Sequence, residues 1–408
     1  MKILYLTQWY DPEPILKGRR FVQGLGGRGH DVEVLTAFPS YPLGHFYEGW
    51  SPALLRTEEE EGVPVHRVLC YPSRDQSILR RAATYLSFAL AATLGALARR
   101  RHWDAVYAYH PPVTVALPAW IAARLAGARF VLDIQDLWPE TLRATTMIGD
   151  GFMYRLVGRV SDFLYRRADR LVVLSEGFRD ALVARGIPQE RIHVIANWSR
   201  FDGGVAIRDP RPPSESEDFE VLYAGAIGPA QGLDVVLEAA GRIASVDAGI
   251  VFRLLGEGID KARLQQRAEE LGLTNVEFLP GVSVTEARGR MAEADSLLIH
   301  LRPDPLFEIT VPSKIQDCLS LGRPIVAGVA GEARTLLERS GAGVLFPPGD
   351  AAGLAESVLA LRNRPVAERS AMAAAARTFY QERLSLDRAL DETELALTAD
   401  ASVPGGPR

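Results

Sequence analysis

The chain has 408 residues, more than one hydrophobic core normally organises, and this length predicts two domains. It is 47% hydrophobic and 24% charged, so each domain can bury a core and wholesale disorder is excluded. A formal net charge of -5 argues against a general nucleic-acid-binding protein, which needs a basic domain or stripe. The two cysteines, Cys70 and Cys318, exclude a disulfide scaffold and a four-cysteine zinc site. The first residues run straight into a strand pattern without a signal-peptide core, so we expect a cytoplasmic protein.

The N-terminal half alternates short apolar runs with helical stretches, which predicts a parallel, doubly wound α/β sheet. The expected strands are 3–6, 32–35, 105–109, 130–132, 171–174 and 193–196. This pattern stops after Asn197, and residues 209–218 are dense in proline, serine and acidic residues, as an exposed connection would be. We therefore expect an N-terminal domain over 1–205 and a linker over 206–218.

The C-terminal half repeats the same alternation, which predicts a second α/β domain over 219–380. Its expected strands are 221–224, 251–255, 276–279, 296–300, 325–327 and 343–346. A last helix is expected over 381–398, followed by a flexible tail over 399–408. Open α/β sheets bind ligands outside the carboxyl ends of their strands, so two such domains predict one ligand each and a shared cleft.

Two glycine-rich segments resemble phosphate-binding loops, and their context separates them. Residues 24–29 end a helix expected to begin near Pro14 and precede a strand, so they predict a helix C-cap and turn, not a dinucleotide site. Gly256 and Gly258 follow a strand and precede a helix, so their amides can face a phosphate. A plain tight turn explains the second pair equally well.

Pro312, Ser313 and Lys314 precede a helical stretch that ends at Gly322, so the hydroxyl, the ammonium and helix N-terminal amides can converge on an anion such as pyrophosphate. The alternative is a surface lysine after a helix-starting proline. Glu308 and Asp317 flank this segment and could accept ribose hydroxyls or simply be solvated.

His110 follows an expected strand and precedes two prolines, which places it at a ligand-binding strand end, although a structural histidine is equally compatible. Residues 133–140 crowd carboxylates beside Trp138 after the next strand, which suits hydroxyl recognition and sugar stacking. No histidine or cysteine pair has metal-ligand spacing, so no metal site is predicted.

Residues 82–98 form an expected helix that carries no charge and is bracketed by arginines on both sides. At about 25 Å it is too short for a hydrocarbon core of about 30 Å. Burial against the sheet and a position at an anionic membrane interface both remain compatible with this pattern.

Taken together, these residues resemble glycosyltransferase family 4, and within it bacterial transferases of capsule, O-antigen and exopolysaccharide synthesis, including fucosamine-type transferases. The resemblance covers nearly the whole chain. Its carriers are 28–32, 39–42 with Gly44, 136–140, 197–198, 223–225 with 231–232, 256–258, 311–314 and 322–326.

The resemblance implies a GT-B fold, with two Rossmann-like domains facing a cleft and a C-terminal helix that returns to the N-domain. It also implies a retaining reaction with no obligatory cofactor or metal and a nucleotide-sugar donor, most often a UDP-sugar. The implied catalytic residues are His110, Lys314 and Glu308; the implied donor-binding residues are Gly225, Gln231, Gly256, Gly258, Ser313, Lys314 and Asp317; the implied acceptor-side residues are Lys17, Gly18, Arg20 and Asp136.

The chain departs from the family pattern at the diphosphate loop, where many members have an arginine and a lysine and this chain has Ala226 and Gln231. Asp317 also replaces the usual ribose-binding glutamate, one residue further from Glu308 than is usual. Lys314, backbone amides and Arg302 would then supply the missing positive charge.

The sequence therefore predicts transfer of a hexose or amino-hexose from a UDP-sugar to a hydroxyl of a saccharide acceptor linked to polyprenyl diphosphate. Such an acceptor would bring the protein to the cytoplasmic face of the inner membrane as a peripheral protein, with no nucleic-acid partner. Two alternatives are a UDP-sugar 2-epimerase of similar fold and an inactive membrane-associated scaffold.

Overall fold

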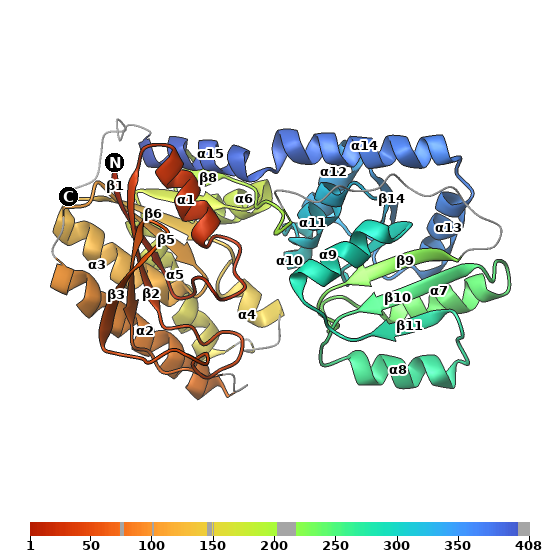
Figure 1. Ribbon diagram of the computed structural model, residues 1–408, viewed down its shortest axis with the longest axis horizontal. Coiled ribbons are helices and arrows are strands. Elements are labelled where there is room, and N and C mark those ends of the chain that lie inside the picture. Colours follow the sequence, from red (N-terminus) through yellow and green to blue (C-terminus); the bar gives the residue numbers. More distant parts are fainter. Residues whose placement is uncertain (74–76, 100–101, 145–148, 150, 202–217, 399–408) are drawn as a thin grey trace. The chain divides into compact units, whose positions relative to one another are not determined.

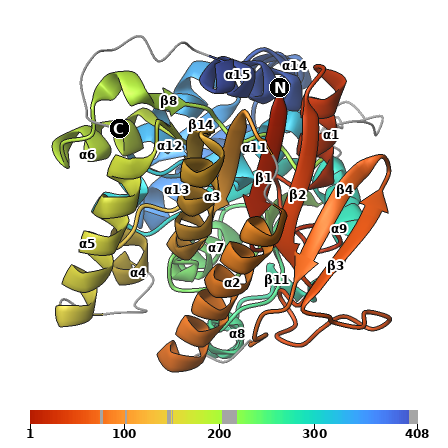
Figure 2. The same cartoon turned by 90° about the vertical axis from the view of Figure 1, so that its left-hand side faces the viewer.

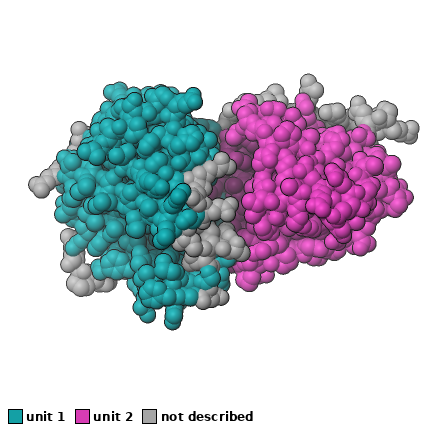
Figure 3. All heavy atoms as spheres, turned by 90° about the horizontal axis from the view of Figure 1, so that it is seen from below, with its two compact units in different colours: residues 1–196, 387–408 teal, residues 197–386 magenta. Residues whose placement is uncertain are grey.

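A computed structural model describes residues 1–73, 77–99, 102–144, 149, 151–201 and 218–398. The chain divides into two compact units, drawn in different colours in Figure 3. Unit 1 comprises Met1–Ala196 together with Asp387–Arg408, and unit 2 comprises Asn197–Leu386. The expected linker, apart from Asp218, and the expected tail lie outside the described residues.

Unit 1 is an eight-stranded sheet in the order β3-β4-β2-β1-β5-β6-β7-β8 (Figure 1). Its strands are β1 (Lys2–Thr7), β2 (Asp31–Ala37), β3 (Leu55–Glu60), β4 (Val63–Val68), β5 (Ala105–His110), β6 (Arg129–Ile134), β7 (Arg170–Val173) and β8 (Ile192–Val194). All neighbours pair in parallel except β3 and β4, an edge hairpin that the apolar-run pattern did not predict. The six strands that were predicted are present, so the doubly wound α/β class is confirmed for this unit.

Helices cover both faces of this sheet: α1 (Arg19–Gly27), α2 (Ile78–Arg99), α3 (Ala116–Ala126), α4 (Glu140–Ala144), α5 (Phe152–Arg167), α6 (Glu176–Ala184) and α15 (Leu386–Thr398). Helix α1 begins at Arg19 and not near Pro14, because the preceding residues form a loop that polar contacts fix. The predicted C-cap is confirmed, since the amides of Gly29 and His30 donate to Gly26 and Leu25 after the helix ends.

Unit 2 is a six-stranded parallel sheet in the order β11-β10-β9-β12-β13-β14, with helices on both faces. Its strands are β9 (Phe219–Ala224), β10 (Ile250–Leu255), β11 (Val276–Leu279), β12 (Ser296–His300), β13 (Ile325–Gly328) and β14 (Gly343–Phe346). Its helices are α7 (Asp234–Ala244), α8 (Lys261–Glu270), α9 (Val284–Glu293), α10 (Pro305–Glu308), α11 (Lys314–Leu321), α12 (Gly331–Ser340), α13 (Ala351–Arg362) and α14 (Val366–Arg383). All six strands predicted for this half are present.

The last helix, α15, follows α14 directly but belongs to unit 1. Asp391 pairs with Arg28 at 2.6 Å, at the C-terminal end of α1, and Arg129 donates to the carbonyl of Leu397. Leu390 and Leu397 are buried. The predicted return of the C-terminal helix to the N-terminal unit is therefore present in the fold.

Candidate functional site

Lys314 is the first residue of α11 and lies beside the carboxyl end of β9 in unit 2. Its Nζ donates a hydrogen bond to the Tyr223 hydroxyl and sits 3.8 Å from the centre of the Tyr223 ring. Among the residues that the structure describes, no carboxylate lies within ion-pair distance of this ammonium, because neighbouring Asp317 pairs with Arg200. Burial therefore lowers the pKa of Lys314 to about 7. An anion that reached this amine would supply the charge that the protein does not.

Gly225 leaves the space that the Lys314 side chain occupies. It has φ +141, and a Cβ at this position would lie 2.7 Å from the Lys314 Nζ. The same residue is approached from the other side by Gly256, with φ +149, where a Cβ would collide with the Gly225 carbonyl. The loops that follow β9 and β10 are thus packed backbone against backbone beneath the lysine.

Gly256 and Gly258 both take part in this close backbone packing. The Gly256 amide donates to the Leu279 carbonyl, and the Ile227 amide donates to the Glu257 carbonyl. Gly258 lies against the backbone of Ile227 in the same way. Of the two interpretations left open by the sequence, this geometry favours a close-packed turn that shapes the loop after β9.

The loop that carries Gln231 is held at two points, and one of the residues that hold it, His300, is itself fixed by Gly349. The Gln231 carbonyl interacts with His300 Nδ1 at 2.6 Å, the Ala230 carbonyl accepts from the Arg302 amide, and His300 Nε2 accepts from the Gly349 amide. The partly exposed Arg302 side chain leaves from the end of β12 beside this loop. This position is compatible with Arg302 supplying charge near the loop after β9.

Asp317, which was predicted to bind ribose, has both carboxylate oxygens engaged within unit 2. It is buried on α11, and its Oδ1 accepts from the Ser199 hydroxyl and the Arg200 amide. Its Oδ2 accepts from the Arg200 guanidinium at 2.7 Å. Asp317 thus holds residues 197–201 in unit 2, which also explains why this unit begins at Asn197 and not after 205.

Ser313 and Glu308, the remaining predicted residues of unit 2, are both exposed. Ser313 caps α11 without a side-chain hydrogen bond to its backbone. Glu308 ends α10, and its main chain packs against Gly331 at the start of α12. The carboxylate of Glu308 and the hydroxyl of Ser313 are therefore accessible to solvent.

In unit 1, Lys17, which was predicted to lie on the acceptor side, is part of a buried polar cluster. Lys17 and Asp133 are ion-paired and their side chains are fully buried. The Tyr107 hydroxyl donates to the same Asp133 oxygen at 2.5 Å, and Gln135 donates to the other. The Lys17 carbonyl accepts from Tyr5. Lys17 therefore fixes the loop between β1 and α1 and does not offer its charge to solvent.

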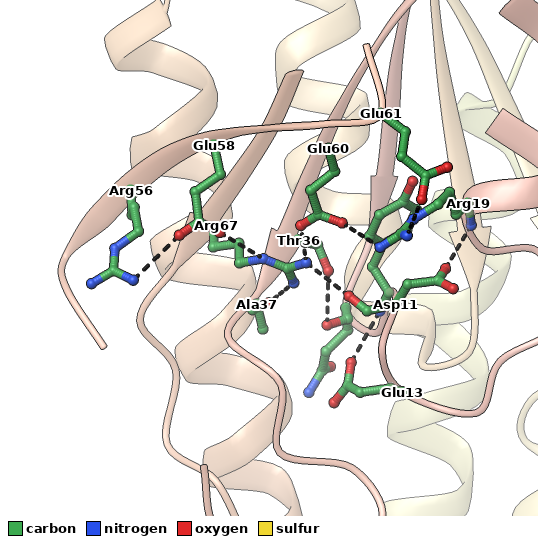
Figure 4. A network of polar contacts seen from close by, with 12 residues as sticks. Asp11, Glu13, Arg19, Thr36, Ala37, Arg56, Glu58, Glu60, Glu61 and Arg67 are labelled. Atoms are coloured by element: carbon green, nitrogen blue, oxygen red, sulfur yellow. Dashed lines mark hydrogen bonds and ion pairs between the residues drawn. The ribbon is translucent and has the colours of Figure 1, made fainter. Parts of the chain in front are cut away.

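A second network, drawn in Figure 4, holds the same loop against the edge hairpin. Buried Arg67 donates to Glu60 at 2.6 Å and to the Asp11 carbonyl at 2.7 Å. The Asp11 carboxylate accepts from the Arg19 amide and fills the space beside Gly18, while Arg20 is exposed. The hairpin that the sequence pattern missed thus also anchors the predicted acceptor-side segment, together with the Lys17–Asp133 pair.

Glu13, in this loop, accepts from the amides of Tyr10, Ser40 and Tyr41. It therefore joins the loop after β1 to the loop after β2. Burial raises the pKa of Glu13 to about 7, although the three amides oppose that rise.

His110 lies at the carboxyl end of β5, as predicted, and is fully buried. Within the described part of the chain neither ring nitrogen has a hydrogen-bond partner, and the imidazole packs edge-on against Trp138 and near Tyr165. Burial lowers the pKa of His110 to about 3, so the ring is neutral near pH 7. A neutral imidazole can exchange a hydrogen bond with a hydroxyl but carries no charge.

Asp136 follows β6 at the same edge of the sheet as His110. Burial raises its pKa to about 6. Tyr85 of α2 packs edge-on against Trp138 beside it, with ring centres 6.4 Å apart. This edge of unit 1 therefore combines aromatic surface with a carboxyl group that titrates near neutral pH.

Three residues that organise these sites had no role assigned from sequence: Tyr223, Arg200 and Tyr107. Tyr223 was named only as part of the motif 223–225. A tyrosine in an otherwise aliphatic strand indicates a hydroxyl with a buried partner, and this signal could have identified it. The described residues contain no group of three or more histidine, cysteine or acidic side chains placed to hold a metal ion.

Both halves of the chain match known family models. Residues 19–198 match the glycosyl transferase 4-like domain, and residues 218–364 match glycosyl transferases group 1. The chain is 30% identical over 83% of its length to a protein assigned as the colanic acid biosynthesis glycosyl transferase WcaI of Escherichia coli, covering 85% of that protein. It is 25% identical to the glycosyltransferase WbjE of Pseudomonas aeruginosa, over 70% of this chain and 73% of that one.

Solved structures share the fold. Anabaena HepE in complex with UDP-glucose matches with a TM-score of 0.66 and 19% identity, covering 98% of this chain and all of that one. WaaG, a glycosyltransferase of lipopolysaccharide biosynthesis, matches with a TM-score of 0.62 and 17% identity over 98% and 100% of the two chains.

The two parallel-sheet units and these neighbours define the GT-B fold. The two family models and the relative WcaI identify the chain as a glycosyltransferase. The chain belongs to glycosyltransferase family 4, as the resemblance of its motifs implied, and within that family it is similar to a transferase of colanic acid biosynthesis.

Proposed function

We propose that this glycosyltransferase is a retaining enzyme that moves a hexose or amino-hexose from a UDP-sugar to a hydroxyl of a lipid-linked saccharide in cell-surface polysaccharide synthesis. The observation that carries the proposal is Lys314, an ammonium that has a lowered pKa, no carboxylate partner among the described residues, and a position against the backbone of Gly225. UDP and UDP-glucose complexes of a protein with the same fold support the choice of donor. The name of the relative WcaI supports the polysaccharide pathway.

In the donor site that we propose, Lys314 binds the diphosphate together with the Ser313 hydroxyl and the backbone around Gly225. Gln231 and Arg302 flank the same loop, so they would contact the phosphates or the sugar. Glu308, whose carboxylate is exposed, would accept hydroxyls of the donor. Gly256 and Gly258 shape the loop without contacting the ligand, and Asp317 acts by holding Arg200.

The group transfer proceeds by exchange at the anomeric carbon of the donor sugar. The bond between that carbon and the β-phosphate oxygen breaks, and a bond to the acceptor oxygen forms on the same face. The acceptor proton passes to the departing phosphate oxygen, and the electron pair leaves with UDP. Lys314 stabilises the negative charge that develops on this oxygen. Stabilisation of developing charge is usually the largest single contribution to catalysis. No metal or other cofactor is obligatory in this scheme.

Unit 1 would supply the acceptor side. His110, neutral and without a partner for its ring nitrogens within the described residues, would exchange a hydrogen bond with a sugar hydroxyl. Asp136 would orient the acceptor hydroxyl, with Trp138 and Tyr85 as stacking surface. Lys17, Gly18 and Arg20 would act through the loop that the buried Lys17–Asp133 pair fixes. The protein would work in the cytoplasm, peripherally at the inner membrane.

A thermal-shift panel of UDP, GDP, ADP and dTDP on the full chain and on Lys314→Ala tests the donor assignment. A ligand at about 100 times its dissociation constant adds about 2.7 kcal/mol, enough to raise Tm by several degrees. Of the four nucleotides, we expect UDP to raise the Tm of the wild type most. We expect the shift with UDP to be much smaller in Lys314→Ala. Equal shifts in both proteins would remove Lys314 from the site, and no shift with any nucleotide would leave an inactive scaffold as the better account.

A further inference from the structure

Helix α2 turns a stripe of leucines to solvent. Its inner face, including Phe88, Ala92 and Ala96, is buried where the helix packs on β2, β4 and α3. Leucines recur on the outer face at helical spacing and are strongly exposed, Leu79 at 81% and Leu90 at 64%. Leu86, Leu94 and Leu97 complete the stripe. By length and composition Leu79–Arg99 could cross a bilayer, but its packed inner face belongs to the layer that covers the sheet.

Helix α5 carries a second apolar stripe of the same kind. Phe152 at its N-terminus is 70% exposed, and Leu156, Val160 and Phe163 follow at helical spacing on the same side. Ser161, Leu164 and Tyr165 form the buried face. An exposed stripe on two helices of one layer is unusual for a soluble surface and indicates an interaction site.

Helix α3 lies between α2 and α5 in the layer that covers one face of the unit 1 sheet (Figure 2). Trp120 of α3 meets Phe163 of α5 edge-on, with ring centres 5.6 Å apart, and Arg167 stacks on both rings. Leu117 and Leu125 of α3 are exposed as well. The three helices therefore form one apolar surface, which we call the α2–α3–α5 face.

The three helices of this face are strongly basic, although the whole chain has a net charge of -5. Asp162 is the single acidic residue in the sequences of the three helices. Their basic residues are Arg80, Arg81, Arg99, Arg124, Arg155, Arg159, Arg166 and Arg167. Apolar stripes edged by arginine are typical of helices that lie in the interface of an anionic bilayer. Two copies of the face would repel each other, so the charge disfavours self-association.

The same end of all three helices lies at the carboxyl edge of the sheet. Helix α3 starts just after β5 ends, while α2 and α5 end just before β5 and β7 begin, so all three run opposite to the strands. The most exposed residues, Leu79 and Phe152, are at these N-terminal ends. Tyr85, on the first half of α2, packs against Trp138, beside Asp136.

We propose that the α2–α3–α5 face docks unit 1 on an anionic lipid bilayer and presents the carboxyl edge of its sheet to the lipid surface. This inference depends on the proposed function in one respect: the enzyme would bind its lipid-linked acceptor at this membrane surface. The leucine and phenylalanine stripes insert among the lipids, and the exposed arginines of the three helices bind the headgroup phosphates, whereas Arg99 pairs with Glu33 inside unit 1.

Co-sedimentation of the full chain with vesicles tests the proposal. We compare phosphatidylcholine vesicles with vesicles that also contain phosphatidylglycerol, at low and high salt. The wild type should bind the vesicles that contain phosphatidylglycerol and not those of phosphatidylcholine alone. High salt should release it. The double variants Leu86→Glu/Leu90→Glu on α2 and Phe152→Glu/Leu156→Glu on α5 should each lower the partition coefficient about tenfold or more. Arg155→Gln/Arg159→Gln should lower it by a similar factor, because each arginine near such a surface contributes roughly fivefold.

The matched control is Val246→Glu/Ile259→Glu, which changes two apolar residues of unit 2 that are 68% and 75% exposed. It should bind vesicles like the wild type. Failure of the wild type to bind anionic vesicles, or equal losses in the control, would overturn the proposal. A wild-type dimer that the α2 or α5 variants convert to a monomer would assign the face to a second copy. The UDP thermal shift, measured on every variant, reports folding and donor binding separately from lipid binding.

Discussion

Two lysines, one fully buried in unit 1 and one partly buried in unit 2, show how differently the units surround a positive charge. In unit 1, Lys17 is fully buried against Asp133, and Tyr107 and Gln135 satisfy the same carboxylate. In unit 2, Lys314 meets the neutral hydroxyl and ring of Tyr223, and burial lowers its pKa to about 7. The first charge is balanced by the protein and fixes a loop. The second lacks such a balance, which is the state expected of a group that awaits an anionic ligand.

The largest expected effect is on stability, in unit 1. Lys17→Met leaves Asp133 buried without its counter-ion, and breaking a buried pair in this way lowers the free energy of unfolding by about 3–5 kcal/mol. We expect a fall in Tm of roughly 10 °C, measured by calorimetry. The double variant Lys17→Met/Asp133→Leu should recover part of the loss, because no charge is then left alone. A single variant with wild-type Tm would show that the pair does not act as described.

The next effect is on catalysis, in unit 2. Lys314→Ala should lower kcat/KM for a UDP-sugar about 10²–10³-fold, because it removes the charge that stabilises the leaving diphosphate. The Tm of the ligand-free protein should change little, since no ion pair is broken. The matched control is Lys261→Ala, which removes a lysine of the same unit that pairs with Glu257 at 2.9 Å. Equal losses of kcat/KM in the two variants would show that Lys314 has no special role in stabilising the diphosphate.

A smaller effect is expected from Tyr223→Phe. The ring that lies under the Lys314 ammonium stays, but the hydroxyl that accepts its hydrogen bond is lost. One such bond contributes about 1 kcal/mol, so the dissociation constant for UDP should rise roughly fivefold, measured by isothermal titration calorimetry. Tyr223→Ala, which removes the ring as well, should have the larger effect. A Tyr223→Phe variant as weak as Lys314→Ala would make the hydroxyl, and not the ammonium, the main ligand of the diphosphate.

The same comparison shows what the sequence could and could not predict. The strands of unit 2 were predictable because a parallel strand buried on both faces is a continuous apolar run. The hairpin of β3 and β4 was not, because Leu55–Glu60 is a charged edge strand with a half-polar pattern. Lys314 was singled out because the sequence places it at the start of a helix, and its role in the site stays a prediction. The pairing of Lys17 with Asp133 was not, because 116 residues separate them and only the folded sheet brings them together.

Asp317 illustrates the same limit within the candidate site. Its position in the motif indicated a ribose ligand, but Arg200, which no local pattern marks, occupies its carboxylate. The motif therefore predicted the position of Asp317 in the chain, but not the contact with Arg200 that the folded unit adds.

The pH dependence of UDP binding tests the central claim, that Lys314 is an unbalanced charge that the diphosphate completes. Its pKa of about 7 lies below the unfolded value of about 10.4. The unfolded state therefore binds more protons between these values, and the destabilisation by Lys314 fades as pH rises through that window. The diphosphate needs the protonated amine, so UDP binding above pH 7 must take up a proton.

Titration calorimetry of UDP between about pH 7 and 9 should therefore show affinity falling by up to about tenfold per pH unit in the wild type. It should also show net proton uptake when buffers of different ionisation enthalpy are compared. Lys314→Arg, which stays charged throughout, should flatten the profile. A wild-type affinity that does not change over this range, with no proton uptake, would contradict the account.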